Sequence, residues 1–172
     1  MASELQVTTI KGVPTGANAN QILVPTGQSL HAPGHVIQLL HTSHATEKTL
    51  SSGSWIDSDL ELSITPKFST SKIYVLYIMQ FRIFSNNADT GIGFRLLRNG
   101  TVVESPATTY DNYIYANGNY TELRGHDTES FLDSPATTSA LTYKIQAQLY
   151  TGTVRVQSDN NKSRITLMEI AQ

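Results

Sequence analysis

Residues 73–84 read Ile-Tyr-Val-Leu-Tyr-Ile-Met-Gln-Phe-Arg-Ile-Phe, the most apolar run of this 172-residue chain. The run is long enough for a buried helix, but its β-branched and aromatic residues and the turn formers on either side favour a strand. Because the run contains few polar residues, we expect both of its faces to be covered. It therefore predicts a central strand of a sheet.

Shorter strands are predicted before and after this run. Leu60, Leu62 and Ile64 alternate with polar residues, as in a strand with one buried face. Asn99-Gly100 is a strong hairpin signal between apolar segments 94–98 and 101–104. Further strands are expected at 36–40, 123–132, 141–150, 154–156 and 165–170, with 154–156 pairing to 141–150 across Thr151-Gly152. Strands at this spacing predict an all-β fold, an antiparallel β-sandwich of the jelly-roll type.

The composition agrees with a sheet protein. The chain has 21 threonines and 17 serines, residues that suit a pleated surface and compete with helical hydrogen bonds. It has no cysteine, which excludes disulfides, thiolate metal sites and a cysteine nucleophile. Its formal net charge of −2 provides no overall field for binding nucleic acid or anionic lipid. No apolar run is long enough for a membrane helix, so we expect a soluble, unprocessed protein with no membrane partner.

The first 33 residues differ from the remainder. Short apolar pieces such as Ile22-Leu23-Val24 are interrupted by proline and glycine every few residues. Such pieces cannot close a core of their own and need a surface to lie on. We therefore predict an extended N-terminal arm over residues 1–33, used for attachment or subunit contacts, and a sandwich domain over residues 34–172.

The search for catalytic and metal-binding patterns gives weak candidates. His41-x-x-His44 has a spacing found in metal sites, but residues three apart on a strand point to opposite faces. Asp57, Asp59 and Glu61 alternate along one exposed strand face, which is more typical of solvated polarity than of a glycosidase pair. Gly91-x-Gly93 lacks the third glycine of a nucleotide-binding loop and is interpreted as a strand kink. We therefore predict no catalytic residue, no metal site and no cofactor.

One segment has the composition of a binding surface. Residues 110–120 combine tyrosine rings with amide and carboxylate groups in a predicted polar loop or edge hairpin. Sugars stack on aromatic faces while their hydroxyls bond to such groups. The candidate glycan or subunit contacts are Tyr110, Asp111, Asn112, Tyr113, Tyr115, Asn117, Asn119 and Tyr120.

Four sequence stretches resemble a family. They are 62–75, which includes Thr-Pro-Lys-Phe-Ser-Thr-Ser-Lys-Ile; 94–100, which ends in Arg-Asn-Gly; 131–145, which begins Phe-Leu-Asp-Ser-Pro-Ala-Thr-Thr; and 163–170, which contains Ile-Thr-Leu-Met-Glu-Ile. Together they resemble a β-sandwich module of tailed-bacteriophage virion proteins. The resemblance implies a jelly-roll-like sandwich, a homotrimer and no catalysis. Similar modules end tail fibres and decorate heads.

We therefore expect a structural protein located in the virion: a short trimeric fibre or adhesin-like tip. Residues 1–33 would bind other virion proteins of the tail, baseplate or capsid, and the tip would contact a host cell-surface glycan. The scattered arginines indicate no nucleic-acid groove. Two alternatives remain open: a capsid decoration protein that stabilises the head, and a carbohydrate-active enzyme or free lectin.

Overall fold

A computed structural model describes residues 30–51, 53–86, 89–105, 110, 112–115 and 118–172, together with Thr9, Gly16, Gln21, Val24 and Thr26. The chain divides into two units, Met1–His31 and Ala32–Gln172. The predicted arm over residues 1–33 falls mostly outside the described residues and stays a prediction. All the strands given below belong to the second unit.

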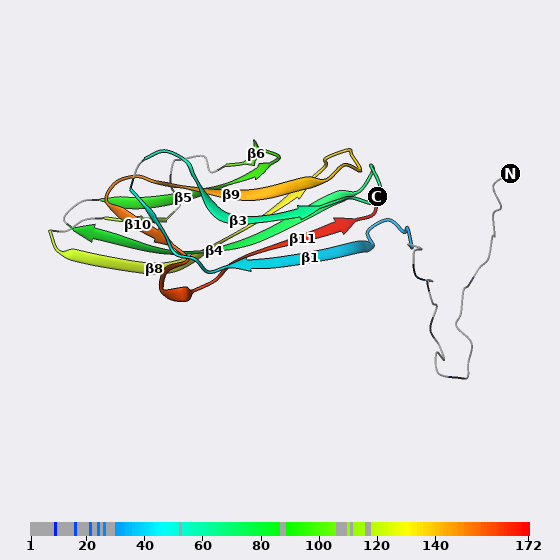
Figure 1. Cartoon of the computed structure of the whole chain (residues 1–172), viewed down its shortest axis with the longest axis horizontal. Helices are drawn as coiled ribbons and strands as arrows, with labels where there is room; N and C mark the ends of the chain where they lie inside the picture. Colours follow the sequence, from blue (N-terminus) through cyan, green and yellow to red (C-terminus); the bar gives the residue numbers. More distant parts are fainter. Residues whose placement is uncertain are drawn as a thin grey trace. The chain divides into compact units, whose positions relative to one another are not determined.

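This second unit is an antiparallel β-sandwich of two layers (Figure 1). The first sheet has the order β1-β11-β4-β10-β2, and β8 pairs with the other edge of β4. Its strands are β1 (Val36–His44), β2 (Lys48–Leu50), β4 (Lys72–Asn86), β8 (Tyr120–Asp133), β10 (Thr153–Val156) and β11 (Ser163–Ile170). The second sheet has the order β3-β9-β5-β6, and β7 pairs with β5. Its strands are β3 (Ile56–Ile64), β5 (Thr90–Arg98), β6 (Thr101–Glu104), β7 (Asn112–Ile114) and β9 (Leu141–Leu149). The predicted all-β sandwich is confirmed.

Strand β4 contains the apolar run and lies at the centre of the first sheet. It pairs with β8 along one edge and with β11 and then β10 along the other. The prediction that both faces are covered is only half right. Val75, Tyr77 and Met79 are buried between the sheets, but the intervening Leu76 and Ile78 are only half-buried on the outer face. Periodicity predicted the strand, but it could not show that no other described element covers its outer face.

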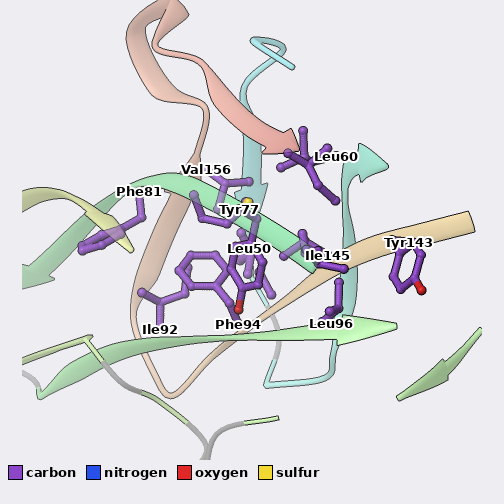
Figure 2. Packing of buried hydrophobic residues seen from close by; sticks show 14 of the residues in the cluster. Leu50, Leu60, Tyr77, Phe81, Ile92, Phe94, Leu96, Tyr143, Ile145 and Val156 are labelled. Carbon is purple, nitrogen blue, oxygen red and sulfur yellow. The ribbon is translucent and has the colours of Figure 1, made fainter. Parts of the chain in front are cut away.

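The core lies between the two sheets and draws on both. Figure 2 shows Tyr77, Phe81 and Val156 from the first sheet near Phe94 and Ile145 from the second. The Phe81 and Phe94 rings pack with their centroids 6.3 Å apart. This apolar burial is the main source of the sandwich's stability.

One predicted pairing is wrong. Strand β10 does not pair with β9 across Thr151-Gly152 but with β4 and β2 in the other sheet. Gly152 has a φ of 81°, a left-handed conformation that glycine adopts without steric cost, and the chain crosses between sheets there. Alternation identifies the buried face of a strand but not the sheet it joins, so the sequence pattern could not separate the two pairings.

A buried polar clasp joins the sheets near the end of β8. The Asp133 carboxylate accepts bonds of 2.7 Å from Arg98 Nη1 at both oxygens and one of 2.7 Å from the Tyr143 hydroxyl. Arg98 and Tyr143 belong to β5 and β9 of the second sheet, whereas Asp133 belongs to the first. Burial and the bond to Asp133 raise the pKa of Tyr143, which keeps its hydroxyl protonated as a donor. The clasp therefore ties β8 to the opposite layer.

A second buried carboxylate holds the loop between β3 and β4. Glu169 Oε1 accepts backbone N–H bonds from Lys67 at 2.8 Å and Phe68 at 3.2 Å, and Oε2 accepts a 2.6 Å bond from Gln38 Nε2. The glutamate is fully buried, so these bonds replace its contacts with water.

Candidate binding surface

Four tyrosine rings form a cluster on the outer face of the second sheet, where β5 begins. The Tyr110 ring stacks on the Tyr113 ring, with centroids 5.1 Å apart and planes 22° apart. Tyr150 packs against Tyr110 at 4.9 Å, and Tyr115 meets Tyr113 edge-on at 6.2 Å. Tyr115 is 79% exposed and Tyr150 51% exposed, so aromatic surface of this tyrosine cluster is open to a ligand.

Gly91 provides the floor of the tyrosine cluster. Tyr113 lies opposite Gly91 in the pairing of β7 with β5. A Cβ atom on Gly91 would lie 3.0 Å from Tyr110 Cγ and 3.0 Å from Tyr113 Cδ2, closer than ordinary packing allows. Gly91 therefore has a packing role, because its missing side chain lets two rings lie against the strand, and the strand kink at Gly91-x-Gly93 stays a prediction.

Hydrogen bonding fixes the middle ring of the cluster. The Tyr113 hydroxyl bonds to the Asp89 carboxylate, and this bond, together with burial, raises the pKa of Tyr113. The ring is therefore held as a neutral phenol over the usual pH range. A fixed ring loses little conformational entropy when a ligand stacks on its neighbours.

The structure brings together only part of the predicted set. Tyr110, Tyr113 and Tyr115 are in the tyrosine cluster, whereas the Asn112 amide donates a 3.1 Å bond to Asp127 Oδ1 on β8. Tyr120 lies on β8 in the other sheet, where its hydroxyl donates to Glu122 Oε2 at 3.4 Å. Asn119 is exposed, and its backbone carbonyl accepts a 3.4 Å bond from the Thr121 hydroxyl. Asp111 and Asn117 lie outside the described residues.

Sequence reasoning missed Tyr150 as a member of the cluster. Tyr150 directly follows β9, and its backbone N–H donates to the Gly91 carbonyl at 2.8 Å. The alternation over 141–149 places Leu149 inward and therefore Tyr150 outward, which was a usable signal. What the sequence lacked was the pairing of β9 with β5, which brings Tyr150 beside Gly91.

The three carboxylates at 57, 59 and 61 do not form one group in the structure. Asp59 has a φ of 63° at a bulge, and its carboxylate pairs with Lys48 at 2.9 Å. Asp57 and Glu61 both face Lys144 Nζ, at 2.9 and 3.5 Å. The bond from Gln146 and the neighbouring Lys144 lower the pKa of Asp57, so it is an ionised partner rather than a proton donor. This geometry favours the interpretation as surface ion pairs.

Among the described residues, no group of three or more His, Asp or Glu side chains is arranged to hold a metal ion. On β1, His41 is exposed and bonds through Nδ1 to the Thr166 hydroxyl at 2.9 Å, whereas His44 is half-buried. No helix in this part of the chain is long and apolar enough to cross a membrane.

Three arginines that seemed scattered in the sequence lie side by side. Arg155 pairs with Arg82 across β10 and β4, and Arg82 pairs with Arg124 on β8. Carboxylates neutralise the row: Glu122 bonds to Arg82 at 2.9 Å and also to Arg124, and the remaining partners are Asp159 and Glu47. With three carboxylates beside three guanidinium groups, the row has no excess charge to attract a phosphate backbone.

Comparisons with known proteins identify no family. No protein-family model matches the chain, and no curated protein sequence matches it. Among solved structures, it is similar to VP2 of infectious bursal disease virus in a subviral particle, with 10% identity and a TM-score of 0.40 over 78% of this chain and 38% of that one. It is also similar to a chain of the T13 particle of that virus, with 13% identity and a TM-score of 0.40 over 94% of this chain and 41% of that one. A third similar structure is dimeric latent PorU of Porphyromonas gingivalis, with 9% identity and a TM-score of 0.31 over 89% of this chain and 15% of that one. The chain spans about two fifths of the length of the viral proteins. At these identities and TM-scores, its function has to be argued from its own residues.

Proposed function

We propose that this chain is a non-enzymatic structural protein of a tailed-phage virion, a short trimeric fibre or adhesin-like tip. In this proposal residues 1–33 attach the protein to the particle, and the sandwich projects outward. The tyrosine cluster is the surface that contacts a host cell-surface glycan.

The observation that carries the adhesive role is the exposed aromatic surface of the tyrosine cluster. Its rings sit on a paired strand, with Gly91 as the floor and Asp89 fixing Tyr113. A pyranose ring can stack on such surfaces with its C–H groups against the aromatic faces. Because the rings are already held in place, little conformational entropy is lost when a ligand binds to them.

Capsid decoration is the second candidate. The same fold could bind shell subunits through residues 1–33 and a sandwich edge, in which case the tyrosines would make a protein contact. A carbohydrate-active enzyme or free lectin is the third candidate. The enzyme would need a pair of carboxylates free to act on a sugar, whereas Asp57 and Glu61 are both engaged with Lys144.

The glycan proposal is tested by binding to a glycan array. Tyr115→Ala and Tyr150→Ala remove exposed rings of the cluster and should reduce binding at least tenfold. Tyr120→Ala is the matched control, because Tyr120 is 62% exposed but lies on the other sheet. Equal binding by all three variants and the unmodified protein would remove the tyrosine cluster as the contact surface.

The virion proposal is tested separately. The protein should be found in purified particles by mass spectrometry, and cryo-electron microscopy should show whether it lies on the tail or the head. Absence from the particles would refute both structural roles, and hydrolysis of a host polysaccharide by the purified protein would support the enzyme instead.

A further inference from the structure

Arg95 of β5 is a half-buried cation that has no carboxylate partner among the described residues. It is four residues from Gly91 on the same strand, so both face outward from the second sheet. The other arginines that are not fully exposed, Arg82, Arg98 and Arg155, each pair with a carboxylate, at 2.9, 2.7 and 3.1 Å. Burial lowers the pKa of Arg95, as expected for a cation that is partly removed from water without a nearby anion. Arg95 is therefore a charge whose counter-ion is missing.

Two neighbours hold the Arg95 guanidinium in one orientation. Its Nε and Nη2 atoms both donate to Gln146 Oε1, at 2.9 and 2.6 Å. The Trp55 ring stacks on the guanidinium, with Arg95 Cζ 4.4 Å from the ring centroid. The Gln146 amide is itself oriented, because its Nε2 donates to Asp57 Oδ1 at 2.7 Å. Arg95 is therefore already positioned before a ligand binds, so little conformational entropy is lost on binding.

The bonds to Gln146 leave the end of the guanidinium free. Gln146 takes the N–H of Nε and one N–H of Nη2. The parallel pair at the end of the guanidinium, one N–H on Nη1 and one on Nη2, has no acceptor in the part of the chain that the structure describes. Such a pair matches the two oxygens of a carboxylate. Asp57 does not supply them, because it bonds to Gln146 and Lys144, so the free end of Arg95 fits a carboxylate of a ligand.

Arg95 lies on the same face as the tyrosine cluster, further along the sheet. Gly91, the floor of the cluster, and Arg95 are four residues apart on β5, a distance of about 13 Å. Gly93 lies between them and has no side chain. On the neighbouring strand β9, Gln146 and Tyr150 have the same four-residue separation (Figure 1). A chain of a few sugars spans such a distance, so one ligand can stack on the tyrosine cluster and also reach Arg95.

From this geometry we propose that the glycan bound at the tyrosine cluster is acidic and that Arg95 binds its carboxylate. The inference rests on the glycan-binding role proposed above and specifies the chemical class of the ligand. Sugar rings stack on Tyr115 and Tyr150, and the carboxylate accepts two charge-assisted hydrogen bonds from the end of the Arg95 guanidinium. Trp55 and Gln146 position that guanidinium for the ligand.

A glycan array that carries uronic-acid and sialic-acid oligosaccharides, each beside its carboxyl-reduced form, tests this inference on the full-length protein. The reduced form keeps the sugar rings and loses the charge. The unmodified protein should bind the acidic form about tenfold more tightly than the reduced form. Arg95→Gln should bind both forms equally, at the level of the reduced form, and Arg95→Lys should keep part of the preference. Arg164→Gln is the matched control, because Arg164 also lacks a carboxylate partner within the described ranges but is exposed on β11 of the first sheet.

The outcomes separate this inference from the proposed function. Equal binding of the acidic and reduced forms by the unmodified protein, with loss of both in Tyr115→Ala, would overturn the acidic ligand and keep the glycan-binding role; this comparison needs no variant at Arg95. A preference that survives in Arg95→Gln, or equal loss of both forms in that variant, would also overturn the inference. So would tighter binding of sulfated than of carboxylated glycans. Binding to no glycan at all would refute the glycan-binding role, and the inference with it.

Discussion

Replacing Asp133 should destabilise the sandwich strongly, because this one carboxylate accepts the bonds of both Arg98 and Tyr143. Asp133→Ala leaves the fully buried Tyr143 hydroxyl without an acceptor, which costs about 1–3 kcal/mol, and removes charge-assisted bonds from Arg98, worth about 1.5–3 kcal/mol. The two contributions together give an expected loss of about 3–5 kcal/mol. Tyr143→Phe removes one hydroxyl and leaves Asp133 paired with Arg98, so we expect about 1.5 kcal/mol.

The measurement is the free energy of unfolding by urea at a fixed protein concentration, because assembly shifts apparent stability. The double variant Asp133→Ala/Tyr143→Phe has no unpaired hydroxyl and should lose less than the two single variants combined, by about 1–2 kcal/mol. Asp133→Asn is the control that keeps the shape and removes the charge. If Asp133→Ala lies within about 1 kcal/mol of the unmodified protein, or if the two single losses simply add, the clasp does not hold the sheets together.

Three further outcomes follow from single contacts. Gly125→Ala places a Cβ atom 2.6 Å from Phe81 Cζ, so thermal unfolding should show a loss of about 1–3 kcal/mol, which Phe81→Leu in the same chain should partly restore. Bonds from Arg82 and Arg124 lower the pKa of Glu122 from 4.5 to about 2; its stabilising contribution is present above pH 4.5 and lost as the pH falls towards 2, and the acid unfolding curve of Glu122→Gln should lack that component. Glu169→Gln exchanges an ionised acceptor for a neutral one and should lower the urea midpoint by an amount corresponding to about 1–2 kcal/mol; an unchanged midpoint would show that the loop does not depend on this charge.

The strands were largely predictable because their signals are local. The run at 73–84 and the Asn99-Gly100 turn lie within β4 and between β5 and β6, and Asn99 and Gly100 have φ values of 49° and 83°, as that hairpin turn requires. Segment 123–132, a predicted strand with few apolar residues, belongs to the 14-residue β8. Its inward positions are polar or glycine at Gly125, Asp127 and Glu129, so alternation of apolar residues was absent there.

The candidate site was less predictable because it depends on pairing between distant segments. Tyr110 and Tyr113 were close in sequence, but Tyr150 joins them only through the pairing of β9 with β5. Tyr120 was close in sequence and lies on the other sheet, because β8 begins there. Composition predicted that the surface is rich in tyrosine. Which tyrosines belong to it depends on strand pairing between distant segments.

The stretches that resemble the bacteriophage module contain the residues of the clasp and of the Glu169 bonds. Two of the four similar stretches supply the buried clasp: Arg98 comes from 94–100, and Asp133 and Tyr143 both come from 131–145. The other two meet at Glu169, which accepts the backbone N–H groups of Lys67 and Phe68. Every one of these residues is engaged in holding sheets and loops together.

The resemblance therefore concerns the construction of the sandwich and not the surface that acts. The tyrosine cluster, the surface proposed to bind a glycan, contributes nothing to the clasp or to the Glu169 bonds. Chains that share the clasp can differ at this surface without loss of the fold. A fibre tip and a decoration protein could thus share the similar stretches, and the choice between them depends on where the protein lies on the particle and on whether variants at Tyr115 change glycan binding.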